Sequence, residues 1–232
     1  MEISKHNKSA LLMGASTLVG RKCLLRLLQH DAYQRIVLLM EEPLDFEHEK
    51  LEIHQVTFER LPDFQQYMRV HDVFYTWTHQ MQIKDDFGKY RPEKTYAFQL
   101  ARLALEAGAR QFLLQSSIAA DKDNVLYYRQ ERKLLEEAIC ELDYWGTHIF
   151  RPGPLLEDQP KNRLNRLFKT VTNQLNEWAD GGLTKYTPIA APDVARAMVY
   201  QAQQFIAGVH IYSAEYLQEF SNDQESGLSK NE

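Results

Sequence analysis

The chain has 232 residues, of which 44% are apolar, and this is enough for one sizeable hydrophobic core in a single α/β domain. A formal net charge of −5, with both signs mixed along the chain, excludes the basic surface typical of a nucleic-acid-binding protein. Two cysteines are too few for a disulfide framework, and the eight histidines show no metal-binding spacing, so we expect no metal site. No apolar stretch approaches the ~20 residues of a membrane helix, and the first residues lack a signal-peptide core. We therefore expect a cytoplasmic protein that does not bind membranes.

Strand-like and helix-like patterns alternate along the first 150 residues. Strands are expected at residues 10–13, 35–40, 51–58, 71–77, 111–115 and 146–150. Helices are expected after Gly20 and at residues 61–68, 93–107 and 124–142, and the polar residues 79–92 are expected to form a loop. This alternation predicts parallel βαβ units in a doubly wound sheet, a Rossmann fold, with strands ordered 3-2-1-4-5-6.

The alternation becomes irregular after residue 150. Residues 151–160 are expected to form a loop, an apolar stripe at 164–178 predicts a lid helix, and residues 192–205 predict another helix before a last strand at 209–212. We therefore expect residues 1–150 to form an NAD(P)-binding core. Residues 151–213 should complete the same domain as a small substrate or lid portion, and the polar residues 214–232 should form a disordered tail.

The first strand leads directly into a glycine turn and a helix. The first amides of a helix are unpaired and its dipole favours an anion, so this arrangement suits a dinucleotide pyrophosphate. The predicted cofactor-binding residues are Gly14, Ser16, Thr17, Leu18, Val19 and Gly20. Thr17 stands where a middle glycine is expected, and its side chain could either crowd the pyrophosphate or bond a phosphate oxygen. The alternative is a strand–helix packing turn that binds no ligand.

The end of the second strand predicts which dinucleotide is preferred. Glu41 follows Gly20 by about 20 residues, where an acidic side chain bonds the ribose 2′-hydroxyl and repels a 2′-phosphate. The sequence therefore predicts NAD(H) over NADP(H). The alternative is that Glu41 and Glu42 only begin a solvated turn before Pro43.

Five segments fall in an order that resembles one protein family. They are GASTLVG, LLQSSIAAD, the tyrosine-containing helix that follows, FRPGPLLED and PDVARAMV. Over roughly residues 8–213, the chain resembles an atypical short-chain dehydrogenase/reductase, and within that family it is most similar to the Tat-interacting oxidoreductase-like group. The resemblance implies a Rossmann fold, a nicotinamide dinucleotide and an oxidoreductase acting on a small carbonyl or alcohol. It also implies that Thr78 and Arg151 lie near the cofactor.

The resemblance implies three catalytic residues. Ser117 corresponds to the serine that holds the substrate oxygen, and Tyr128 corresponds to the tyrosine that exchanges a proton with substrate. Arg132 stands where the family has a lysine, and an arginine cannot pass on a proton at neutral pH. Tyr127 competes for the tyrosine role, but it would place Glu131 at the lysine position. The alternative is a surface helix that carries an ordinary tyrosine and arginine.

Two functions from different classes remain open. The first is an NAD(P)-dependent oxidoreductase with an unidentified small-molecule substrate. The second is a catalytically weak or inactive protein on the same fold that senses a dinucleotide or binds a protein partner, and in its extreme form it binds no dinucleotide. A nucleotide-sugar epimerase is a weaker third interpretation, because little chain after residue 151 remains for a sugar-binding domain.

Overall fold

The computed structural model describes residues 6–42, 44–76, 95–117, 125–156 and 187–228, except for the side chains of residues 58, 125–129 and 224–228. The strands are β1 (Lys8–Met13), β2 (Tyr33–Met40), β3 (Leu51–Gln55), β4 (Asp72–Tyr75), β5 (Gln111–Gln115), β6 (Gly146–Phe150), β7 (Leu155–Leu156), β8 (Ile189–Ala190) and β9 (Gly208–Tyr212). The helices are α1 (Leu18–Gln29), the 3₁₀ helix η1 (Phe58–Met68), α2 (Tyr96–Glu106), α3 (Val125–Cys140), α5 (Ala191–Ala202) and α6 (Ala214–Leu228).

The main sheet is parallel and has the order β3-β2-β1-β4-β5-β6-β9. This confirms the predicted doubly wound fold and strand order, and β9 extends the sheet beyond β6. β3 ends earlier than predicted because η1 begins three residues after it. Within the predicted loop after β6, β7 pairs with β8 in a separate two-stranded sheet.

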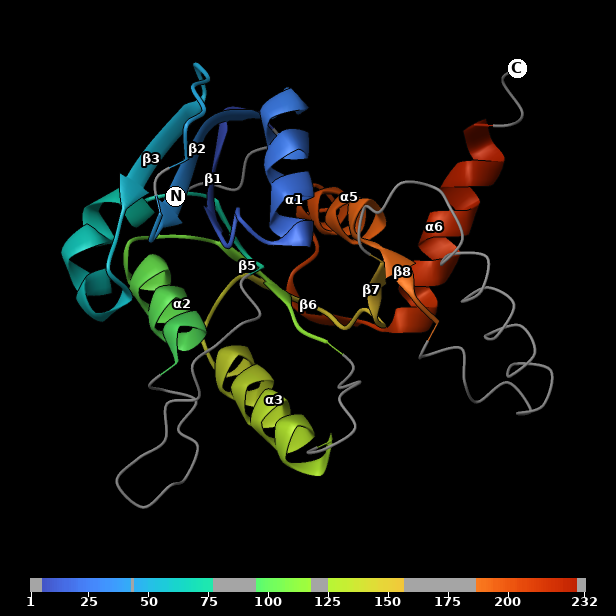
Figure 1. Cartoon of the computed structure of the whole chain (residues 1–232). Coiled ribbons are helices and arrows are strands. Elements are labelled where there is room, and N and C mark those ends of the chain that lie inside the picture. The colour runs from blue at the N-terminus through green and yellow to red at the C-terminus, as the bar shows by residue number, and fades with distance from the viewer. Residues whose placement is uncertain (1–5, 43, 77–94, 118–124, 157–186, 229–232) are drawn as a thin grey trace.

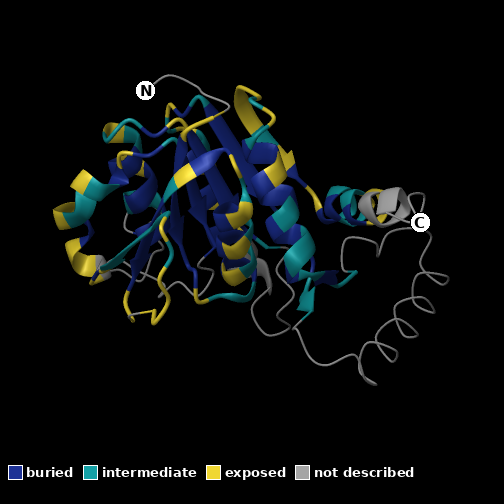
Figure 2. Cartoon of the chain, turned by 90° about the horizontal axis from the view of Figure 1, so that it is seen from above, coloured by how far each residue is buried: buried dark blue, intermediate teal, exposed yellow. Residues whose placement is uncertain are grey.

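Helices cover both faces of the main sheet (Figure 1). α1 and α5 pack on one face against side chains that include Leu12 and Phe74, and α2 and α3 pack on the other against Leu11 and Val73. Adjacent residues of one strand enter different cores because successive side chains of a strand point to opposite faces. Figure 2 shows the buried sheet between partly exposed helices. Burial on both faces explains why continuous apolar runs, rather than alternating ones, predicted the central strands.

The predicted disordered tail is wrong for residues 214–228, which form α6. Ala214 and Leu217 are buried, and the rings of Tyr216 and Phe220 pack close together, with Phe220 also against Tyr200 of α5. These apolar residues recur at helical spacing and give α6 a face to bury. The polar composition of the segment concealed that face. The predicted lid helix at 164–178 lies outside the described residues.

Candidate functional site

The glycine turn lies at the carboxyl end of β1 and carries a tightly packed helix start. Gly14 has a φ of 98°, which favours glycine, and it leads into Thr17, the N-cap residue of α1. A Cβ on Gly20 would lie 1.9 Å from the Gly14 carbonyl oxygen and 2.6 Å from the Thr76 hydroxyl. Gly20 is therefore required for the close contact between α1 and the turn.

The Thr17 side chain faces the protein and caps α1. Its hydroxyl accepts a hydrogen bond from the Gly20 amide at 3.0 Å and donates one to the Gly14 carbonyl at 2.9 Å. Thr76, which follows β4 and is fully buried, places its own hydroxyl 3.1 Å from the same carbonyl oxygen. Of the two roles considered for Thr17, a hydroxyl that bonds a phosphate oxygen directly does not agree with this geometry.

Two main-chain amides at the start of α1 remain as donors. Within the described part of the chain, the amides of Leu18 and Val19 have no hydrogen-bond partner. They precede the first intrahelical hydrogen bond, and the Thr17 hydroxyl accepts a hydrogen bond from the amide of Gly20 rather than from either of them. They stand at the positive end of the α1 dipole, beside a turn that lacks side-chain bulk at Gly14. These groups fit the pyrophosphate of a dinucleotide.

Acidic side chains lie at the neighbouring strand ends. Glu41 is exposed and directly follows β2, and its carbonyl accepts a hydrogen bond from Gln55 at the end of β3. The hydroxyl of Tyr96, at the start of α2, donates to Glu59 at 3.2 Å. Burial raises the pKa of Tyr96, and the charges of Glu59 and Glu41 raise it further. This edge of the site is therefore electronegative.

The carboxyl end of β5 contributes hydroxyl and amide groups. The amide of Ser116 donates to the Phe150 carbonyl at 2.7 Å, and the adjacent Ser117 is half-buried. Among the described residues, the Ser116 hydroxyl and the Gln115 side-chain oxygen are buried without a hydrogen-bond partner. Neither Gln115 nor Ser116 was among the predicted site residues, which include only the neighbouring Ser117 at this strand end.

Charged side chains of α3 are buried beside β6. Arg132 is only 8% exposed, and Glu136, one turn further along α3, is 5% exposed. Arg151 donates hydrogen bonds to the Glu136 carboxylate from its Nε at 3.0 Å and from its Nη2 at 2.5 Å. The alternative of an ordinary surface helix is therefore wrong for Arg132. Glu136 was missed as a site residue, although its spacing of four residues from Arg132 was a usable signal.

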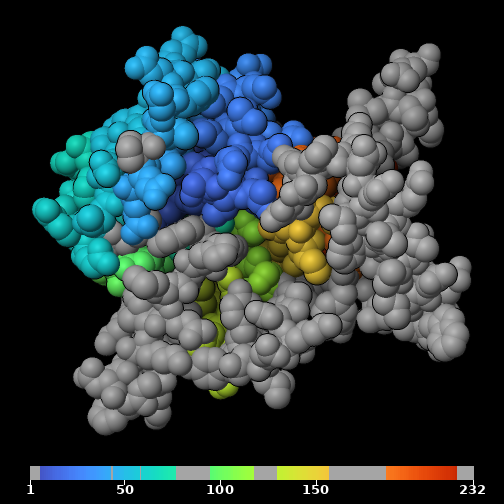
Figure 3. Space-filling view, viewed as in Figure 1, coloured from blue at the N-terminus to red at the C-terminus, as the bar shows by residue number. Residues whose placement is uncertain are grey.

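Parallel strands bring these groups to one edge of the sheet. The turn after β1, Glu41 after β2, Ser117 after β5 and Arg151 after β6 all follow the carboxyl ends of their strands. In the space-filling view, blue surface from the N-terminal part of the chain adjoins green and gold surface from later segments (Figure 3). Tyr128 belongs to α3, one turn before Arg132, but its side chain lies outside those described. Thr78 also lies outside the described residues.

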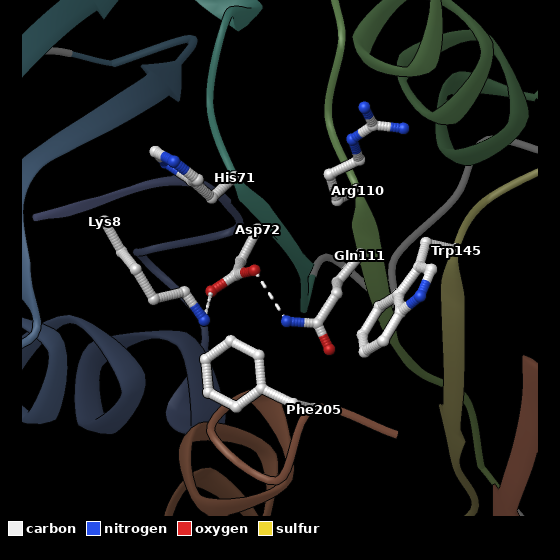
Figure 4. A pocket seen from close by; sticks show the side chains of 7 residues that line it. All are labelled: Lys8, His71, Asp72, Arg110, Gln111, Trp145 and Phe205. Atoms are coloured by element: carbon white, nitrogen blue, oxygen red, sulfur yellow. Dashed lines mark hydrogen bonds and ion pairs between the residues drawn. The ribbon is translucent and has the colours of Figure 1, made fainter. Parts of the chain in front are cut away.

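A second polar cluster lies at the opposite, amino end of the sheet (Figure 4). Lys8 and Asp72 form a buried ion pair of 2.5 Å, and Asp72 also accepts hydrogen bonds from Tyr33 at 2.6 Å and from Gln111 at 2.8 Å. Burial lowers the pKa of Lys8, and the Asp72 charge opposes that shift. A small pocket here is lined by Lys8, His71, Asp72, Arg110, Gln111, Trp145 and Phe205. Sequence analysis predicted none of this cluster.

His148 of β6 extends the cluster toward β9. Its Nε2 lies 3.2 Å from the Gln111 side-chain oxygen, which only accepts, so the neutral ring carries its proton there. Its Nδ1 lies 3.0 Å from the Tyr212 hydroxyl, which also lies 3.2 Å from the Gln201 side-chain oxygen. Burial, with smaller contributions from His210 and Lys8, lowers the pKa of His148 to about 4. No group of residues that could hold a metal ion occurs in the described part of the chain.

Comparison with known proteins identifies relatives over most of the chain. No family model matches it. The rat protein HTATIP2 is 30% identical over 186 residues, which cover 78% of this chain and 77% of that protein. The FMP52 protein of Debaryomyces hansenii is 32% identical over 111 residues, and the match spans 46% of this chain and 47% of FMP52.

Solved structures with the same fold are more distant in sequence. The Bordetella bronchiseptica enzyme WbmH, in complex with NAD⁺, is 13% identical, with a TM-score of 0.58 over 96% of this chain and 83% of WbmH. A short-chain dehydrogenase family protein from Francisella tularensis is 12% identical, with a TM-score of 0.56 over 90% of this chain and 98% of its own. At these identities the likeness shows the fold alone.

The expected cytoplasmic location is contradicted by the relatives. The FMP52 protein of Debaryomyces hansenii and four further similar proteins, of which the chain spans about half the length, are named as mitochondrial. A missing secretory signal and a missing membrane span do not distinguish a mitochondrial protein from a cytoplasmic one. None of the helices in the described ranges is long and apolar enough to cross a membrane.

The extent of the HTATIP2 match and the Rossmann architecture agree with the resemblance drawn from the five sequence segments. The chain therefore belongs to the atypical short-chain dehydrogenase/reductase family, as a relative of HTATIP2.

Proposed function

We propose that the protein binds a nicotinamide dinucleotide at the carboxyl end of the sheet and reduces or oxidises a small carbonyl or alcohol substrate. The observation that carries this proposal is the pair of main-chain amides of Leu18 and Val19 at the start of α1, which have no hydrogen-bond partner among the described residues. A dinucleotide pyrophosphate is the anion that this strand–turn–helix arrangement suits. The NAD⁺ complex of WbmH, which has the same fold, supports the assignment.

The cofactor would be held by residues from four strand ends. Gly14, Ser16, Thr17 and Gly20 shape the turn around the two amides. Glu41, exposed after β2, would bond the ribose hydroxyls and repel a 2′-phosphate, so NAD(H) would be preferred over NADP(H). Thr78 and Arg151 follow β4 and β6 and would lie toward the nicotinamide end.

The bound dinucleotide would supply or accept the hydride. Tyr128 would donate a proton to the carbonyl oxygen, and Ser117 would orient that oxygen. Arg132 would lower the Tyr128 pKa and favour its phenolate, and its burial supports this role because a cation acts more strongly where water is excluded. Since arginine keeps its proton at neutral pH, it cannot relay one, and turnover would be slow.

A second candidate function is a dinucleotide sensor without turnover. Two observations favour it: Arg132 replaces the lysine of the catalytic pattern, and the Thr17 hydroxyl is engaged inside the turn. A sensor would bind the dinucleotide and change its contacts with a protein partner.

We further propose a mitochondrial location, following the names of the FMP52 relatives. Fractionation of cells that express the tagged protein would test this location.

Titration with NADH and NADPH, followed by nicotinamide fluorescence, tests the proposal. We expect saturable binding of both, with NADH bound more tightly. Incubation of the NADH complex with a panel of small aldehydes and ketones then separates the two candidates, because only an enzyme oxidises NADH. Absence of binding at millimolar concentrations of either dinucleotide, a Kd equivalent to only about −4 kcal/mol, would contradict both candidates.

A further inference from the structure

Three polar groups of the glycine turn converge on one atom, the hydroxyl oxygen of Thr17. The Gly14 carbonyl oxygen lies 2.9 Å from it, the Gly20 amide nitrogen 3.0 Å and the Thr76 hydroxyl oxygen 3.4 Å. Thr76 is fully buried and Gly20 is buried, so none of these groups has ready access to bulk water. The Thr17 hydroxyl therefore closes the turn from within.

The hydrogen-bonding capacity of a hydroxyl limits what Thr17 can do further. A hydroxyl has one proton, and Thr17 donates it to the Gly14 carbonyl while it accepts from the Gly20 amide. Only acceptor capacity remains. A phosphate oxygen is itself an acceptor, so it gains no hydrogen bond from Thr17 in this arrangement.

A smaller residue at position 17 would change that limit. The backbone of Thr17 is extended, with φ of −77° and ψ of 165°, so alanine or glycine fits without strain. Without the hydroxyl, Gly14, Gly20 and Thr76 would face a space with three polar partners, which is the environment of a buried water. A water has two protons: one can reach the Gly14 carbonyl, and the other can point outward.

We infer that the Thr17 hydroxyl takes the place of a water that would otherwise bridge the glycine turn to a bound pyrophosphate. This inference rests on the proposed dinucleotide site and concerns how strongly that site binds. Leu18 and Val19 keep their amide contacts to the phosphates, but the bridging hydrogen bond is lost. In return, the turn holds its shape without a ligand, because Thr17 caps α1 permanently.

Substitutions at position 17 separate the effect of the water from the effect of the cap. Thr17→Ala and Thr17→Gly make room for a water, Thr17→Val removes the hydroxyl but keeps the volume, and Thr17→Ser keeps the hydroxyl. We expect NADH to bind about 3- to 10-fold more tightly to the alanine and glycine variants, the gain of roughly one hydrogen bond of ordinary net strength. The valine variant should not bind more tightly than wild type, and the serine variant should match wild type.

Thermal unfolding without dinucleotide provides a readout that is independent of binding. The alanine, glycine and valine variants should all unfold at a lower temperature than wild type, and the serine variant should not. If the glycine variant does not fold, the alanine and valine pair carries the same comparison.

The outcomes distinguish the inference from the function on which it rests. Equal NADH affinity in wild type and the alanine and valine variants would overturn the inference and leave dinucleotide binding intact. Equal tightening by alanine and valine would also overturn it, because the gain would then come from loss of the cap. Failure of wild type and all variants to bind NADH or NADPH would instead contradict the proposed function.

Discussion

The two ends of the parallel sheet differ in whether their buried polar groups have hydrogen-bond partners. At the amino end, Asp72 forms an ion pair with Lys8 and accepts hydrogen bonds from Tyr33 and Gln111, so the buried charges are paired. At the carboxyl end, the buried Ser116 hydroxyl has no hydrogen-bond partner among the described residues, and neither has the amide of Leu18. Buried polar groups are normally paired, so unpaired groups mark where a ligand or water is expected.

This difference favours the carboxyl end of the sheet as the ligand-binding site. Ligands of open α/β sheets bind beyond the carboxyl ends of the strands, where the unpaired donors lie. The amino-end cluster also contains charged groups, but the hydrogen bonds of Asp72 are made within the cluster. We therefore expect changes at the amino end to alter stability without altering dinucleotide binding, and changes at the carboxyl end to alter dinucleotide binding or catalysis.

The largest expected effect is on stability, at the amino end. Lys8→Met leaves Asp72 buried without its cation and should lower the free energy of unfolding by about 3 kcal/mol, the lower part of the range for a broken buried pair, because Tyr33 and Gln111 still donate. Urea denaturation measures the loss. Lys8→Met with Asp72→Asn should recover part of it, and NADH affinity should stay unchanged in both. A loss within the ~1 kcal/mol typical of a surface pair would contradict the buried ion pair.

The next effect is on catalysis, at the carboxyl end. If the protein turns over a carbonyl substrate, Tyr128→Phe should lower kcat by about 100-fold or more, the usual contribution of general acid–base catalysis, with unchanged NADH affinity. Arg132→Lys should raise kcat, because lysine can relay a proton. Tyr127→Phe is the matched control and should retain activity. Full activity in Tyr128→Phe would show that another group supplies the proton.

The third effect is a pH dependence of stability. The pKa of His148 is about 4 in the folded protein, below the ~6.5 of an unfolded histidine, so the unfolded chain binds a proton that the folded chain does not. Stability from this residue is therefore present above pH 6.5 and is lost as pH falls, by about 2 kcal/mol at pH 5.

Burial also lowers the pKa values of His30 and His71, so wild type loses stability at low pH from these residues too. Urea denaturation of wild type and His148→Gln, each above pH 6.5 and at pH 5, therefore isolates the contribution of His148. Glutamine can still contact Gln111 and Tyr212. The variant should lose less stability between the two pH values than wild type does. Identical losses would show that His148 is protonated without cost in the fold.

The smallest expected effect is on cofactor choice. Glu41→Arg should shift the preference toward NADPH by about tenfold, equivalent to about 1.4 kcal/mol, because a like-charge contact becomes an ion pair. Relative Kd values for NADH and NADPH measure the shift. Glu42→Arg, at the adjacent exposed position, is the control. Tighter binding of NADPH than NADH by wild type would already reject the assigned role of Glu41.

The sequence was sufficient for the fold because burial follows from local pattern. All six residues of β1 are buried, and the turn from Gly14 to Gly20 marks where the chain reverses. α6 was missed because its apolar residues are separated by polar ones, and composition outweighed spacing in that segment.

The details of the site depend on contacts between distant segments. The direction of the Thr17 hydroxyl is set partly by Thr76, which is 59 residues away in the chain. The burial of Arg132 and the pairing of Glu136 with Arg151 depend on how α3 packs beside β6. No local pattern distinguishes a polar residue that a neighbouring strand will bury from one that stays solvated.

Hydrogen–deuterium exchange with and without saturating NADH tests the contrast between the two ends most directly. Ligand binding should slow exchange of the amides at residues 16–20, because the Leu18 and Val19 amides become hydrogen-bonded. Exchange at residues 8–9, 71–72 and 110–111, at the amino end, should stay the same. Protection at the amino end, or no protection in the glycine turn when NADH is bound, would contradict the account.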